Sequence, residues 1–230
     1  MNQPPNQNDF VIVKKLAPFF FCFSVYFVLH DIPYEDPSLL DVAIKCAPIV
    51  NLIHFVKSHR CTQGCQYSNR ILLGLFFCCA GDIFLMWKSG FLYGMIAFIF
   101  GHVQYILAFG FTPLKLKLYF VILPCALFAL QTLYQGLSGI FLIGVPIYIL
   151  IISVMVWRAV ARVQNNWTYL QIGTCVGSIL FAISDTFIGV ETFISPVAYS
   201  NILIMATYYI AQLGISLSVL EDPHLNRTVN

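Results

Sequence analysis

Apolar segments long enough to cross a membrane follow one another along this chain from about residue 16 to residue 220. A spanning helix needs about 20 mostly apolar residues, and in lipid only helices and closed barrels satisfy all their backbone polar groups. Charged residues make up only 10% of the chain, whereas soluble domains have roughly a quarter. No room is left for a separate soluble domain, so we predict an all-α polytopic membrane protein.

The apolar segments predict a bundle of about eight transmembrane helices. Their expected ranges are 16–29, 39–56, 71–87, 92–111, 117–133, 137–157, 169–189 and 200–220. Residues 14–220 then form one transmembrane domain. We expect the polar, proline-containing segment 1–13 to be disordered and residues 221–230 to form a short tail.

Basic residues lie mostly on one side of this arrangement. If the N-terminus is cytosolic, ten of the twelve Lys and Arg residues lie in cytosolic segments, Lys88 lies on the other side, and Lys45 lies within the second helix. Cytosolic loops of membrane proteins carry an excess of Lys and Arg. We therefore expect both termini to face the cytosol, which requires an even number of helices. No basic tract suggests nucleic acid binding.

Two carboxyl groups, Asp82 and Asp185, and the imidazole of His102 lie inside apolar segments. A charged side chain at the centre of a spanning helix costs roughly 2.5–3.5 kcal/mol on insertion scales, and such residues usually face the bundle interior and have a function. Helix position places them, with four further polar residues, between the outer half of the bilayer and its midplane. These four are Lys45, Tyr105, Tyr208 and Gln212. Their similar depth predicts one shared cavity.

Small residues beside these polar positions indicate which helices pack closely. Gly173 and Gly177 form a GxxxG pair on the helix of Asp185, and further glycines lie near Asp82 and His102. Small residues let membrane helices approach one another without a hydrophobic driving force. The polar side chains would then line the interior of the bundle.

Two carboxyl groups in different surroundings can form an acid/base pair, with one protonated and the other ionised near neutral pH. Such a pair suits hydrolysis through an oxocarbenium-like cation, because one acid donates a proton and the other group activates water. Three alternatives remain. The polar residues could only hold the bundle together, they could serve a lipid or proton-coupled transporter, or Asp82, His102 and Asp185 could hold a catalytic metal. The loop containing His59, Cys61 and Cys65 has no standard zinc spacing, and we predict no metal.

Several short stretches together resemble the lysoplasmalogenase (YhhN-like) family of integral membrane proteins, in its animal branch. They are LAPFFFCFSVYF (16–27), KCAPIV (45–50), GDIFLMW (81–87), FLYGMIAFIFGHVQYILAFGFTPL (91–114), LFAISD (180–185), ETF (191–193) and MATYYIAQLGISLS (205–218). Within them, the GD, H-x-x-Y, SD and YY-x-x-Q elements occur in the expected order. The resemblance covers nearly the whole chain.

The resemblance implies a multi-pass hydrolase of the endoplasmic reticulum membrane without a cofactor. It would cleave the vinyl ether bond of a lysoplasmalogen to give a fatty aldehyde and glycerophosphocholine or glycerophosphoethanolamine. The two aspartates of the family match Asp82 and Asp185, the expected catalytic pair. We expect five residues to bind substrate or support catalysis: Lys45, His102, Tyr105, Tyr208 and Gln212. The expected partners are the lysophospholipid and the bilayer, and a homo-oligomer stays open.

Overall fold

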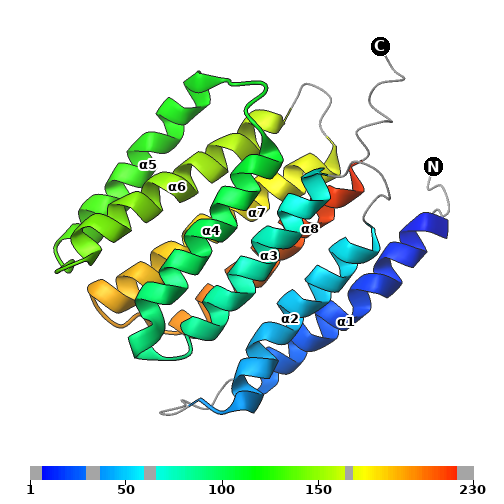
Figure 1. Cartoon of the computed structure of the whole chain (residues 1–230), viewed down its shortest axis with the longest axis horizontal. Helices are drawn as coiled ribbons and strands as arrows, with labels where there is room; N and C mark the ends of the chain where they lie inside the picture. Colours follow the sequence, from blue (N-terminus) through cyan, green and yellow to red (C-terminus); the bar gives the residue numbers. More distant parts are fainter. Residues whose placement is uncertain (1–6, 30–36, 60–65, 164–167, 222–230) are drawn as a thin grey trace.

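In the computed structural model, eight α-helices run side by side as one bundle (Figure 1), within the described residues 7–29, 37–59, 66–163 and 168–221. The helices are α1 (Gln7–Leu29), α2 (Leu39–Ser58), α3 (Gln66–Phe84), α4 (Phe91–Phe109), α5 (Leu116–Tyr134), α6 (Phe141–Arg162), α7 (Tyr169–Phe193) and α8 (Ser200–Leu217). Two short 3₁₀ helices, η1 (Lys88–Gly90) and η2 (Ser218–Leu220), precede α4 and follow α8. The described residues contain no strand, and the all-α prediction is confirmed.

Seven of these helices are long and apolar enough to cross a membrane, which confirms a polytopic membrane protein. The eighth, α3, is less apolar because it begins with the polar run Gln66–Arg70 and carries Asp82 near its end. It nevertheless packs along α4 and against α2 and α8, and Figure 1 shows it running parallel to the other helices of the bundle.

Several helix bounds differ from the predicted ranges. α6 begins at Phe141 rather than at residue 137, because Gly139 has a φ of +55°, which a right-handed helix does not allow. α3 begins earlier than predicted and α7 ends later, since a helix satisfies its own backbone and can continue past the apolar run. α1 begins at Gln7, inside the segment expected to be disordered. Residues 1–6, 60–65 and 222–230, with Cys61 and Cys65, lie outside the described residues.

Glycines bring two pairs of helices into close contact, as the sequence predicted. A Cβ atom on Gly101 of α4 would lie 2.8 Å from the Cys78 sulfur of α3. One on Gly177 of α7 would lie 2.7 Å from the backbone oxygen of Ala211 in α8. Real Cβ atoms do not approach other atoms this closely. These two contacts pack α3 against α4 and α7 against α8, the helices that carry Asp82, His102, Asp185 and Tyr208.

The helices at the two edges of the bundle have few neighbours. α1 packs mainly on α2, whereas α5, at the opposite edge in Figure 1, packs on α6 and α7. The first turn of α1 and the last turn of α8 lie at the same end of the bundle. This end also carries Lys57, Arg70 and Arg162, and we call it the basic end.

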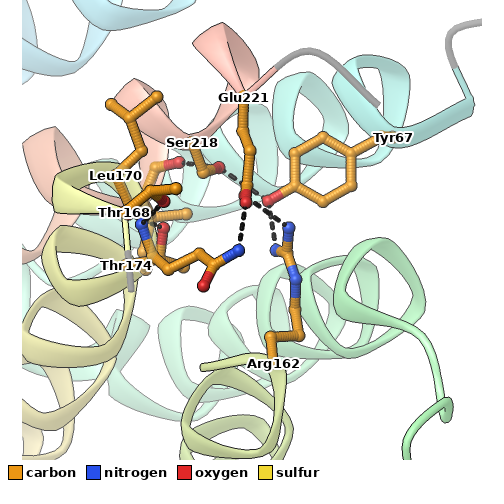
Figure 2. Close-up of polar contacts among 9 residues, drawn as sticks. Tyr67, Arg162, Thr168, Leu170, Thr174, Ser218 and Glu221 are labelled. Carbon is orange, nitrogen blue, oxygen red and sulfur yellow. Dashed lines mark hydrogen bonds and ion pairs between the residues drawn. The ribbon is translucent and has the colours of Figure 1, made fainter. Parts of the chain in front are cut away.

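A polar cluster joins four segments at the basic end (Figure 2). Arg162 of α6 donates hydrogen bonds to the Tyr67 hydroxyl of α3 and, over 3.0 Å, to the Glu221 carboxylate after η2. Gln171 of α7 donates to the other carboxylate oxygen, and Tyr67 donates to Ser218 over 2.7 Å. The Arg162 guanidinium also lies 4.8 Å from the centre of the Tyr67 ring. These contacts connect α3, α6, α7 and the end of α8.

Candidate functional site

Asp185 of α7 belongs to a hydrogen-bonded group of three side chains. The Tyr148 hydroxyl of α6 donates to Asp185 Oδ2 over 2.5 Å, and His102 Nε2 of α4 lies 3.0 Å from that hydroxyl and 3.3 Å from the same carboxylate oxygen. Because the Tyr148 hydroxyl donates its hydrogen to Asp185, it can only accept from His102. Nε2 of His102 is therefore the protonated ring nitrogen, and its hydrogen points toward Tyr148 and Asp185. His102 is fully buried, and its Nδ1 has no hydrogen-bond partner among the described residues.

Tyr148 was not among the residues selected from the sequence. The available signal was its position, since it lies in the middle of the otherwise apolar run Pro146–Ile152 of α6. Tyrosine is common in membrane proteins at the interface with water, whereas a hydroxyl at this depth needs an internal partner. The partner here is Asp185.

Asp82, near the end of α3, forms a second group with α8. The Tyr208 hydroxyl donates to Asp82 Oδ2 over 2.6 Å, and both residues are buried. Lys45 of α2 does not form a contact ion pair with Asp82. The next tyrosine, Tyr209, donates to the Lys45 backbone oxygen over 2.7 Å and so fixes α8 against α2.

Tyr105 and Gln212 form a third polar contact in the core. The Tyr105 hydroxyl donates to Gln212 Oε1 over 2.7 Å, and neither side chain has any exposed surface. Tyr105 lies one turn after His102 on α4, and Gln212 lies one turn after Tyr208 on α8. The pair therefore lies one turn closer to the basic end than the two aspartate groups.

Two phenylalanine rings lie between the aspartate groups. The Phe181 ring of α7 is 4.7 Å from the His102 ring and 5.3 Å from the Tyr208 ring, measured between centroids. The Phe98 ring of α4 lies 6.1 Å from both Phe181 and Tyr208. We call these two rings the aromatic layer. The aromatic layer could not be predicted from the sequence, because phenylalanine is abundant throughout the chain.

A cavity of about 610 Å³ lies between α4, α5, α6 and α7, and it is partly open to the outside of the bundle, where Val121 and Ile179 of its wall are exposed. Apolar side chains form most of its wall, and Asp185 is the one charged residue among those that line it. Tyr148 and Phe98 also line the cavity, so Asp185 and its tyrosine partner face it directly. The volume falls within the ~300–1,000 Å³ usual for small-molecule sites.

The cavity corrects one expectation from the sequence. Of the seven predicted site residues only Asp185 lines it, and His102 contacts Asp185. Asp82 and Tyr208 lie on the other side of the two phenylalanine rings, Tyr105 and Gln212 pair one turn away, and Lys45 lies on α2. Similar depth in the membrane does not fix which way a side chain points, and α5 completes the cavity without any predicted site residue. Within the described residues, no three His, Cys, Asp or Glu side chains come together as a metal site would require.

This geometry can carry out acid–base chemistry on an apolar molecule. A carboxyl group, supported by a tyrosine and an imidazole, faces a cavity with little other polarity, and a second carboxyl lies behind an aromatic layer. A proton can be exchanged at Asp185 with an atom of a molecule in the cavity if that atom comes within hydrogen-bond reach. The apolar wall limits water, which strengthens electrostatic effects on a charged intermediate.

Comparisons with known proteins agree with this interpretation. The model of the YhhN family matches residues 40–219. The chain is 42% identical to Lysoplasmalogenase TMEM86A of Bos taurus, over 90% of this chain and 89% of the relative, and 37% identical to Lysoplasmalogenase TMEM86A of Homo sapiens over the same shares. It is 35% identical to Lysoplasmalogenase TMEM86B of Sus scrofa, over 92% of this chain and 89% of the relative. No solved structure matches.

The family match covers well over half of the chain and includes Asp82, Asp185 and the three polar contacts around them. The chain therefore belongs to the YhhN family.

Proposed function

We propose that this chain is a lysoplasmalogenase, a membrane hydrolase that cleaves the vinyl ether bond of a lysoplasmalogen. The observation that carries the proposal is the position of Asp185, which presents a carboxyl group to an apolar cavity inside the bundle. The names of the relatives, at up to 42% identity over 90% of the chain, agree with this activity.

The reaction suits a carboxyl group in apolar surroundings. Protonation of the β-carbon of the vinyl ether gives an oxocarbenium ion, and water then adds to the carbon that bears the oxygen. The added water loses a proton, and the hemiacetal collapses to a fatty aldehyde and the free hydroxyl of the glycerophospho head group. One acid must supply the first proton, and a carboxylate must stabilise the cation and direct water.

We assign these tasks to Asp82 and Asp185, with Asp185 the group that meets the substrate. Tyr148 and His102 hold the Asp185 carboxyl at the cavity wall, and Tyr208 holds Asp82. Tyr105 and Gln212 support the packing of α4 against α8 one turn away.

The proposed topology places both termini in the cytosol. It is supported by the Lys and Arg bias and by the shared end of the first turn of α1 and the last turn of α8 in Figure 1. A location in the endoplasmic reticulum membrane is proposed from the family resemblance alone.

The test is aldehyde release by the purified protein from a lysoplasmalogen, beside matched lysolipids with a saturated ether or an ester bond. We expect aldehyde from the vinyl ether only, because the saturated ether cannot form an oxocarbenium ion by protonation of carbon. A folded protein that binds or moves the lysoplasmalogen but leaves the vinyl ether intact would instead identify a transporter.

A further inference from the structure

We propose that the part of the cavity between Asp185 and the basic end binds the hydrocarbon chain of the substrate and limits its length. This rests on the proposed lysoplasmalogenase function and extends it to chain recognition. We call this part the chain slot, and define it by six apolar residues of α5, α6 and α7: Leu118, Ile122, Ile152, Val156, Val160 and Ile179.

The cavity is elongated along the helices. Its lining residues extend from Leu118 to Leu133 on α5 and from Val145 to Val160 on α6. Fifteen residues at a rise of 1.5 Å give a length of about 22 Å. One leaflet of a bilayer, about half of the ~30 Å hydrocarbon core, accommodates an extended lipid chain in ~15 Å. The cavity is therefore long enough for one such chain.

Asp185 lies nearer the outer end of α7, eight residues before Phe193 and sixteen residues after Tyr169. Tyr148, which holds Asp185, lies near the outer end of the α6 lining, with only Val145 beyond it. In the other direction the lining continues to Val160, twelve residues or about 18 Å away. On α7 the lining extends six residues toward the basic end, to Ile179, and eight residues the other way, to Phe193, so apolar space lies in both directions. The chain slot is the part toward the basic end, where α5 is antiparallel to α6, with Tyr119 near Ser153.

The amphipathic character of the substrate decides which direction its hydrocarbon chain takes. The vinyl ether lies at the head of the hydrocarbon chain, so the remaining carbons need a continuous apolar space that starts at the reacting carboxyl. The chain slot provides this space, because Asp185 is the one charged residue of the lining and the slot residues are aliphatic. The polar head group must reach water, and the outer end of the bundle is the end nearer to Asp185, so the head group points there and the chain points toward the basic end.

A series of substitutions along α6 tests whether the chain slot limits the length of the hydrocarbon chain. Ile152→Trp, Val156→Trp and Val160→Trp place a bulky ring about 6, 12 and 18 Å from Tyr148 along the helix. We expect kcat/KM for the longest alkenyl chains to fall about 10-fold or more in each variant. The longest chain still accepted should become shorter as the ring approaches Tyr148, while the shortest chains keep near wild-type turnover.

A matched control lies on the same helix. Leu150 is 54% exposed and does not line the cavity, so Leu150→Trp adds the same ring on the outer surface and should leave the chain-length profile unchanged. An unchanged profile in the folded Val156 and Val160 variants would overturn the proposal. Ile152→Phe replaces Ile152→Trp if the larger ring prevents folding.

A second experiment does not depend on turnover, so it separates this proposal from the proposed function. A saturated-ether lysolipid with a photoreactive diazirine at the chain terminus is crosslinked to the wild-type protein in vesicles of diacyl phospholipid. We expect label on Leu118, Ile122, Val156 and Val160, reduced by Val156→Trp and by excess lysolipid. Label on lipid-facing residues, or equal competition by diacyl phospholipid, would show general contact with membrane lipid and contradict a chain site.

Discussion

The Tyr148 hydroxyl of α6 donates a 2.5 Å hydrogen bond to Asp185 Oδ2 of α7, at the wall of the cavity between α4, α5, α6 and α7. His102 of α4 contacts both partners, so three helices meet at a single carboxyl group. The contact gives Asp185 a fixed orientation toward the apolar space. We regard it as the structural basis of the proposed reaction.

Removing the hydroxyl should slow catalysis without unfolding the bundle. We expect Tyr148→Phe to lower kcat about 10- to 100-fold, since one hydrogen bond to a charged group contributes ~1.5–3 kcal/mol. KM should change little, because the ring still lines the cavity. Steady-state aldehyde release measures both constants. Tyr119→Phe is the control, as the Tyr119 hydroxyl has only a 3.5 Å contact with Ser153. Equal kcat values for Tyr148→Phe and Tyr119→Phe would show that the Tyr148 hydroxyl does not support the reaction.

The neighbouring tyrosines of α8 separate a catalytic effect from a packing effect. Tyr208→Phe removes the hydrogen bond to Asp82 and should lower kcat about 10-fold or more. Tyr209→Phe removes a bond to the Lys45 backbone and should lower the free energy of unfolding by about 1 kcal/mol at nearly unchanged kcat. Turnover and thermal unfolding in detergent, measured on both variants, give the comparison. The reverse pattern would place Asp82 outside the reaction.

Close packing of α7 on α8 predicts opposite results at two glycines four residues apart. Gly177→Ala puts a Cβ 2.7 Å from the Ala211 backbone oxygen and should cost about 1–3 kcal/mol. Gly173→Ala meets no atom within 4 Å, so it should be neutral or stabilising by up to ~1 kcal/mol through helix propensity. Melting temperatures in detergent test this pair. Equal destabilisation by both changes would argue against the described helix contact.

The cluster in Figure 2 should contribute to stability rather than to catalysis. Arg162→Met leaves Glu221 and the Tyr67 hydroxyl without their cationic partner and should destabilise the protein by about 1–3 kcal/mol. The kcat of the folded variant should stay near wild type. Arg70→Met, which removes only a bond to Gln104, is the milder control. A large loss of kcat at unchanged stability would contradict this role.

The sequence predicted the bundle because runs of apolar residues have few stable alternatives in lipid. It placed Asp82, His102, Asp185 and Tyr208 at similar depth, and the structure brings His102 to Asp185 and Tyr208 to Asp82. Which residues pair could not be predicted, because depth follows from position along a helix whereas pairing depends on how each helix is rotated.

The position of the cavity could not be predicted from the sequence for a related reason. Its walls are ordinary aliphatic residues of α5, α6 and α7, which look the same in sequence whether they face lipid or an internal space. Tyr148 was missed because the face of α6 that meets Asp185 becomes visible only once α6 is packed on α7. The predicted start of α6, residue 137, is too early. Leu137 and Ile140 are apolar, so the apolar run looks as if it begins there although Ser138 and Gly139 interrupt it.

The most direct test of the account is aldehyde release from a lysoplasmalogen by the purified protein and by its Asp82→Asn and Asp185→Asn variants. Asparagine keeps the shape of the side chain but can neither donate an acidic proton nor carry the negative charge. The account predicts turnover by the wild type and its loss in both variants, with thermal unfolding showing that both remain folded. Retained turnover in both variants would contradict catalysis by the two aspartates.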